Sequence, residues 1–247
     1  MYEIIKHIWV ILVFCACQRT PVTEIIDLAP IETQKEISNF SADWDINQIF
    51  TVKLADENDT KKNVKPDYNI KKGDISMYDD IFKKYSVKIG WDWRLLAALV
   101  YQESRFIPDI RSKRGAYGLM QIMPATLSYF GADTTSTPDQ HIAAGVAYIK
   151  YLDRLLVEHV TDESERIKFI LASYNIGPGH IFDARRLAEK YGKDANIWEN
   201  NVDSFLLRKS EPQYYNDPEV RNGKCYGNET LIHVRQIMEQ YERYKNL

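Results

Sequence analysis

The chain has 247 residues, a formal net charge of −3 and 45% hydrophobic residues, which is typical of one or two globular domains and excludes a wholly disordered chain. Its 32 lysine and arginine residues nearly balance 35 aspartate and glutamate residues. No basic block stands out, so the sequence argues against a nucleic-acid partner.

The first residues resemble an export signal. A short head precedes an apolar run over 8–16, and polar residues follow at once. The run is too short to span a bilayer, which needs about 20 apolar residues, and it has the length of a signal-peptide core. It ends in Phe14-Cys15-Ala16-Cys17, which resembles a bacterial lipobox. We therefore expect a signal peptide over 1–16 and lipidation of Cys17. An ordinary secretory signal cleaved nearby is the alternative.

The segment 17–73 is polar and shows no sustained periodicity, which is typical of a tether. Behind a lipid anchor, such a tether would hold a folded domain away from the membrane surface. Removal of the signal leaves Cys17 and Cys225, and acylation of Cys17 would rule out an intramolecular disulfide.

From Ser76 onward, apolar residues recur at helical spacing. A first helix is predicted between Ser76, as a possible cap, and Gly90. Asp92 is a candidate N-cap for a second helix over 93–104, whose apolar residues surround it on nearly all sides. A helix of that kind is normally buried.

Further helices follow in chain order. Pro124 begins a short helix and Pro138 a long one. Asp162 and Glu165 form an acidic capping box before the next helix, which Gly-Pro-Gly at 177–179 ends. Helices are also predicted over 180–191 and from residue 228, with a long surface loop over 209–228 between them. No alternating strand pattern occurs in this region, so the predicted fold class is mainly α.

Glu103 is an unusual residue at the end of the apolar helix. Burial and the negative end of the helix dipole both disfavour its ionised form and should raise its pKa. A carboxyl group that stays protonated near neutral pH can act as a general acid. Taken alone, the residue also fits a glutamate that turns to solvent.

Four motifs in a characteristic order overturn that simpler interpretation. They are ESRF at 103–106, GAYGLMQIMPAT at 115–126, AGVAYIKYL at 144–152 and ASYNIGPG at 172–179. Together they resemble the lysozyme-like superfamily of soluble lytic transglycosylases, and within it the catalytic domain of the F-type membrane-bound enzymes. The resemblance covers about 74–247 and implies a helical catalytic domain with a substrate cleft. F-type enzymes commonly carry a solute-binding-like domain first, and the segment before Asp74 is too short to hold one.

The resemblance implies cleavage of the β-1,4 bond between N-acetylmuramic acid and N-acetylglucosamine in peptidoglycan, with a 1,6-anhydro product. Glu103 would protonate the glycosidic oxygen and then accept a proton from the muramyl C6 hydroxyl, which attacks the anomeric carbon. Because the substrate supplies the nucleophile, the resemblance implies neither metal nor organic cofactor. The histidines also lack zinc-ligand spacing.

The same motifs imply a substrate-binding set beside Glu103. Glycines allow a tight loop near the sugar chain, and amide, hydroxyl, thioether and aromatic groups offer surfaces for acetamido groups and sugar rings. The residues are Ser104, Gly118, Met120, Gln121, Tyr174 and Asn175. Capping of the helix end is the alternative role for Ser104, and core filling is the alternative for Met120.

The sequence departs from the family pattern at His233, where a tyrosine near the catalytic glutamate is usual. An imidazole there would orient the carboxyl group, and its protonated form would lower the glutamate pKa. Alternatively, His233 only packs on the last helix.

Two other functions remain open, a lysozyme-like hydrolase in which water attacks and a non-catalytic peptidoglycan-binding module. In each case the expected partners are glycan strands and, through the lipid anchor, a membrane. The expected location is periplasm-facing, at the outer membrane.

Overall fold

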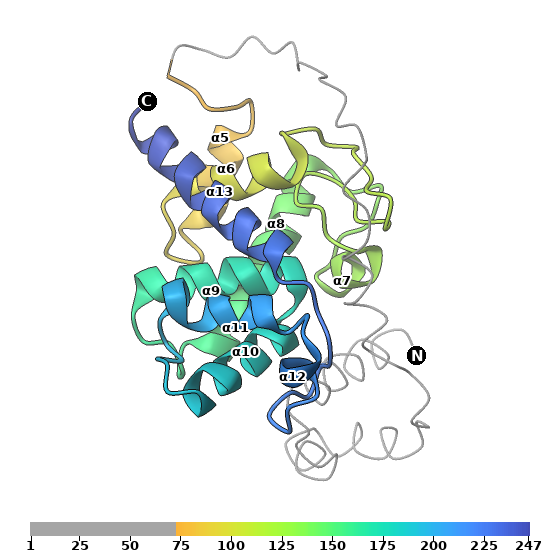
Figure 1. The fold of residues 1–247 in the computed structure, drawn as a ribbon. Helices are drawn as coiled ribbons and strands as arrows, with labels where there is room; N and C mark the ends of the chain where they lie inside the picture. Colours follow the sequence, from red (N-terminus) through yellow and green to blue (C-terminus); the bar gives the residue numbers. More distant parts are fainter. Residues whose placement is uncertain (1–72) are drawn as a thin grey trace, which may run out of the picture.

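A computed structural model of the protein describes residues 73–247 (Figure 1). The predicted signal peptide, Cys17 and all but the last residue of the predicted tether lie outside the described residues. The described part is mainly α, as predicted. Its only β pairing consists of two isolated bridges, Arg111 with Tyr117 and Tyr117 with Ile122. None of its helices combines the length and the apolarity that crossing a bilayer requires.

The helices follow one another with short connections, except for the long loops between α6 and α7 and between α12 and α13. In chain order they are α5 (Asp79–Ser86), α6 (Trp93–Ser104), α7 (Pro124–Tyr129), α8 (Pro138–Leu156), α9 (Glu163–Ile176), α10 (Pro178–Lys190), the π-helical turn η2 (Trp198–Val202), α11 (Asp203–Arg208), α12 (Pro212–Tyr215) and α13 (Asn228–Lys245).

Helix α6 lies in the core. Asp92 caps it by accepting a hydrogen bond from the Arg94 backbone N–H at 2.9 Å, as predicted. The six residues from Leu95 to Val100 are at most 2% exposed. α5 and α13 both pack against α6, and α13 also contacts α9. Helix α13 therefore joins the two halves of the domain, one built around α5 and α6 and the other around α9, α10 and α11 (Figure 1). Burial of one such leucine contributes about 1.5–3 kcal/mol relative to exposure.

The first predicted helix is shorter than expected. α5 begins at Asp79 and ends at Ser86, not at Gly90. The Asp79 carboxylate accepts hydrogen bonds from the backbone and the hydroxyl of Ser76, both at 2.9 Å. Ser76 is therefore held in the turn before the helix and does not cap it.

The junction of α9 and α10 differs from the prediction in two details. Asp162 caps α9 through the Glu165 backbone N–H at 2.9 Å, but the Glu165 carboxylate accepts from the Trp198 backbone instead of closing the capping box. Gly177, with φ 96°, ends α9, and α10 starts directly at Pro178. Proline fits a first helical turn because its missing N–H has no partner there anyway.

The segment between α10 and α13 carries more structure than expected. η2 and α11 were not predicted, and the predicted loop over 209–228 contains the short helix α12. Val202, Phe205 and Leu206 from this segment are at most 3% exposed. The helices are too short for a period to show in the sequence, and they form because tertiary packing buries these three side chains.

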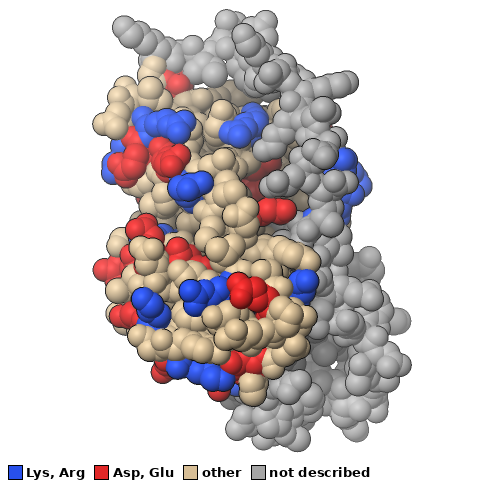
Figure 2. Space-filling view, in the orientation of Figure 1, with Lys and Arg blue, Asp and Glu red and all other residues tan. Residues whose placement is uncertain are grey.

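The surface viewed in Figure 2 carries acidic and basic side chains interspersed over both halves of the domain. This pattern agrees with the near balance of charges in the sequence.

Candidate active site

The chain turns sharply just after Glu103, the second-last residue of α6. Arg105 and Phe106 both have left-handed backbone conformations, with φ of 55° and 63°. Their side chains pack around Tyr101, the Arg105 guanidinium 4.2 Å from the Tyr101 ring centre and the Phe106 ring 5.5 Å away. These contacts offset the conformational strain of two residues with left-handed backbone conformations, and they fix the end of α6. The position of Glu103 is therefore well defined.

Glu103 meets His233 from α13. The distance from Glu103 Oε1 to His233 Nε2 is 3.4 Å, and the two side chains are 8% and 9% exposed. Tyr174 from α9 lies close enough for the Glu103 charge to act on it. Burial, reinforced by that charge, raises the pKa of Tyr174 well above its usual value. The tyrosine therefore stays a neutral hydroxyl at every physiological pH.

The loop that follows α6 is tied to itself by hydrogen bonds. The Gly118 N–H donates to the Ile110 carbonyl at 2.9 Å. The Gln121 side-chain nitrogen donates to the carbonyls of Ile110 and Gly118, at 3.0 and 2.9 Å. Gln121 itself has φ 45° and Gly118 φ 77°. The amide nitrogen of Gln121 thus holds the loop, and its oxygen is the atom that remains for a ligand.

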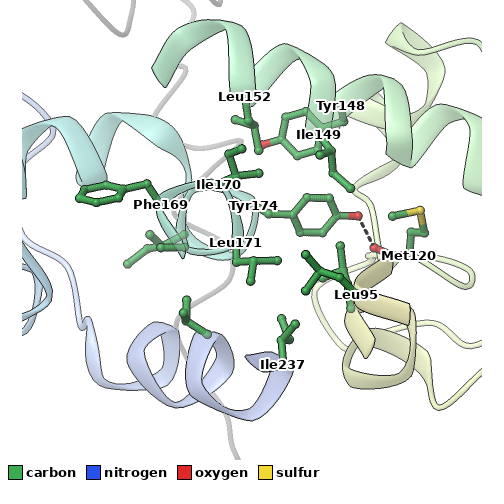
Figure 3. Close-up of a cluster of buried hydrophobic side chains, with 14 of the residues drawn as sticks. Leu95, Met120, Tyr148, Ile149, Leu152, Phe169, Ile170, Leu171, Tyr174 and Ile237 are labelled. Carbon is green, nitrogen blue, oxygen red and sulfur yellow. Dashed lines mark hydrogen bonds between the residues drawn. The ribbon is translucent and has the colours of Figure 1, made fainter. Parts of the chain in front are cut away.

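A glycine of α8 seats the loop by leaving space for Met120. A Cβ on Gly145 would lie 2.0 Å from the Met120 sulfur. Met120 has no exposed surface, and its carbonyl accepts a hydrogen bond from the Tyr174 hydroxyl at 2.7 Å (Figure 3). The Met120 side chain thus fills the core, which is the alternative that the sequence left open. Its backbone connects the loop to α9.

Asn175 and Ser104 also have internal partners. The Thr230 hydroxyl of α13 donates to Asn175 Oδ1 at 2.7 Å, which joins α9 to the helix that carries His233. The Ser104 hydroxyl donates to the Val100 carbonyl at 3.0 Å and is buried. The substrate role predicted for Ser104 stays a prediction, and the helix-end role has a visible contact.

The structure brings the eight predicted residues other than Cys17 into one connected set. Glu103 faces His233, the Tyr174–Met120 hydrogen bond links α9 to the glycine loop, and Asn175 links α9 to α13. Sequence reasoning missed Thr230, Gly145 and His141. A Cβ added to Gly118 would lie 2.4 Å from Nδ1 of the His141 ring, so only glycine fits beside this ring. Gly145 had a signal, since glycine inside a long helix often marks close packing.

Metal ligation has no support within residues 73–247, where no group of three or more His, Cys, Asp or Glu side chains comes close enough to hold an ion. Cys225 is buried in this part, and burial raises the pKa of its thiol to about 11, so it is not a reactive nucleophile.

Comparison with known proteins gives a consistent family. The Transglycosylase SLT domain family matches residues 80–197. Proteins named membrane-bound lytic murein transglycosylase F are 37% identical in Marinobacter nauticus, over 168 residues, and 37% identical in Shewanella frigidimarina, over 191 residues. These alignments cover 68% and 77% of this chain but 33% and 38% of the relatives. The chain thus spans about a third of the length of the curated relatives that it matches.

Among solved structures, an inactive mutant of the lytic transglycosylase Slt from Pseudomonas aeruginosa aligns with a TM-score of 0.44 at 20% identity, covering 69% of this chain and 24% of that one. The four ordered motifs, the family match over 80–197 and the sequence relatives agree. Residues 80–197 of the chain therefore belong to the Transglycosylase SLT domain family.

Proposed function

We propose that the protein is a peptidoglycan lytic transglycosylase that cleaves the bond between N-acetylmuramic acid and N-acetylglucosamine and forms 1,6-anhydromuramic acid. The observation that carries the proposal is the buried Glu103 at the end of α6, 3.4 Å from His233 and electrostatically coupled to Tyr174. Burial favours the protonated carboxyl group, which a general acid needs.

In this mechanism Glu103 acts twice. It first protonates the glycosidic oxygen, and as a carboxylate it then takes the proton of the muramyl C6 hydroxyl as that oxygen attacks the anomeric carbon. The reaction needs one protein carboxyl group, whereas many glycosidases use two, one of them to activate water or to form a covalent bond. The substrate's own 2-acetamido group would stabilise the developing positive charge.

The other residues of the set either contact the substrate or position the groups that do. The Gln121 oxygen and the Asn175 amide are the groups that we expect to contact the sugar chain, and Gly118 lets the loop backbone approach it. Ser104, Met120 and Tyr174 use their visible contacts to position these groups. His233 orients the Glu103 carboxyl group.

The test is mass spectrometry of muropeptides released from purified peptidoglycan by the wild type and by Glu103→Gln. Glutamine has nearly the same shape but cannot donate a proton as an acid, so we expect anhydromuramyl products that fall at least a thousandfold in the variant. Products with a reducing end would make the protein a hydrolase. No product from either protein would favour a binding module or an enzyme that a partner activates, and products that persist in the variant would remove Glu103 from its catalytic role.

For the whole protein we propose a periplasm-facing location, with the domain tethered to the outer membrane through a lipid on Cys17. The support is the lipobox-like sequence and the membrane-bound relatives. We expect the wild type in the membrane fraction and Cys17→Ser in the soluble fraction, with equal activity on purified peptidoglycan. A wild type that is already soluble would favour an ordinary cleaved signal.

A further inference from the structure

A cavity of about 660 Å³ lies on α10, away from the candidate active-site residues, none of which lines it. Phe182 forms an apolar wall, and the His159 ring meets it edge-on at 5.5 Å. The lining of the cavity contains more basic than acidic residues. Two are acidic, Glu189 and Asp194, and four are basic: Arg185, Arg186, Lys193 and Arg221.

Arg185 forms hydrogen bonds only to neutral groups, although the charges of Glu189 and Asp194 in the same lining act on it from further away. Its guanidinium donates to the Ala195 carbonyl and to Asn196 Oδ1, both at 2.9 Å and both neutral, and it lies 5.8 Å from the Phe182 ring centre. Within residues 73–247 no carboxylate forms an ion pair with it. The side chain is half-buried, and burial lowers the pKa of its guanidinium. A cation in this setting is stabilised when an anion enters the cavity.

The second arginine shares its acidic partner. Arg186 donates to Asp183, but the fully buried Lys209 also donates to that carboxylate, at 2.6 Å. One carboxylate therefore serves two cations. The backbone amides of Arg221 and Asn222 donate to it as well, both at 2.9 Å, which fixes the loop that carries Arg221 at the cavity rim.

We propose that this cavity binds an oxyanion, namely a free carboxylate on the peptide stem of peptidoglycan. The identity of this ligand rests on the proposed function. Arginine is suited to planar carboxylates because its guanidinium presents two parallel N–H donors. Phe182 offers an apolar surface to the peptide beside the charged end.

Along the chain, the cavity lies next to the candidate site. α10, which carries Phe182 and Arg185, follows α9, whose last turn carries Tyr174 and Asn175.

The test measures binding without cleavage. Calorimetry would use a synthetic four-residue stem peptide with free carboxylates, the same peptide with its carboxylates amidated, and inorganic phosphate. We expect Arg185→Gln to weaken binding of the free peptide about tenfold, the scale of one lost hydrogen bond between charged groups. Lys193→Gln should weaken it less. Its side chain makes no hydrogen bond within the described residues, so this variant keeps the fold even if Arg185→Gln loosens the loop.

Arg243→Gln is the matched control, since Arg243 is exposed on α13 and pairs with Glu239. It should bind the peptide like the wild type. Equal binding by the wild type and both cavity variants, or equal binding of the free and amidated peptides, would overturn the proposal. Binding of phosphate without binding of the peptide would overturn the assignment to peptide stems. Because Glu103→Gln should bind the peptide normally, failure of this site and failure of the proposed reaction are distinguishable.

Discussion

The buried pair of Glu103 and His233 can hold a single proton on either side chain. With 3.4 Å between Oε1 and Nε2, a proton on the imidazole stabilises the carboxylate, and in that state Glu103 cannot protonate the glycosidic oxygen. Tyr174, the other titratable side chain coupled to Glu103, does not compete, because burial and the Glu103 charge raise its pKa well above 10.

Replacement of His233 therefore tests its role. We expect His233→Tyr to move the alkaline limb of the kcat/KM profile to higher pH by roughly one unit, the low end of what an adjacent opposite charge produces. The measurement is the pH dependence of anhydromuropeptide release. His233→Phe, which lacks the hydroxyl, separates loss of titration from a new hydrogen bond. An alkaline limb that stays in place in both variants would mean that His233 only packs on α13.

At the scale of elements, the glycine loop is positioned on α8 by two close contacts. Gly118 lies against His141, and Gly145 lies against Met120. His141 is itself held by the Asp133 carbonyl, 2.8 Å from Nε2. These contacts fix how closely the loop approaches α8, and the Tyr174–Met120 hydrogen bond fixes how closely it approaches α9. The position of Gln121 relative to Glu103 therefore depends on the close packing of the loop against α8.

Gly145→Ala should push Met120 out of its place. The added Cβ would lie 2.0 Å from the sulfur, so we expect a loss of about 1–3 kcal/mol in the free energy of unfolding and a lower rate of product release. Met120→Ala removes the obstacle at the cost of a cavity. In the double variant the alanine at 145 should cost far less than it does alone, which urea unfolding of all four proteins measures. Additive losses would show that the two side chains do not compete.

Some elements could be predicted from sequence because local signals agree. The bounds of α6 follow from Asp92 and from a long apolar pattern, the start of α8 follows from Pro138, and the start of α9 follows from Asp162. The helices α11 and α12 have six and four residues, too few for periodicity to be seen. Their formation depends on distant packing partners, which a sequence does not reveal.

The candidate site shows the same division. Apart from His233, its residues were found through the ordered motifs, and their types already indicated acid, amide and glycine roles. Their contacts could not be found, because the Thr230–Asn175 and Glu103–His233 pairs depend on how α13 lies against α9 and α6. The burial of Met120 likewise depends on a glycine 25 residues further along the chain.

At the scale of the whole molecule, a buried charged cluster ties α10 to the segment after α11. Lys209 donates to Asp183 at 2.6 Å and to His180 Nδ1 at 2.9 Å. Burial, and next the Lys209 charge, lower the pKa of His180 from 6.5 to about 3. Burial alone would raise the pKa of Asp183, but Lys209 and the backbone amides more than offset it and lower that pKa.

The cluster predicts how global stability depends on pH. Between pH 6.5 and about 3 the unfolded chain binds a proton at His180 that the folded protein does not, so stability is complete above this range and falls as the pH is lowered. From pH 7 to pH 5 the loss from His180 should be about 2 kcal/mol, at 1.36 kcal/mol per unit. Asp183 does not contribute in this window, because its lowered pKa affects stability only below about pH 4.

His180→Asn should remove this loss. The asparagine oxygen can accept the Lys209 hydrogen bond in place of Nδ1, but the side chain does not titrate. Urea unfolding at pH 7 and pH 5 should therefore show a smaller decrease for the variant than for the wild type. His159→Asn is the control, because His159 is exposed and should change the decrease much less. If the wild type and His180→Asn lose equal stability, the buried histidine takes up its proton without unfolding, and the cluster must open locally to admit it.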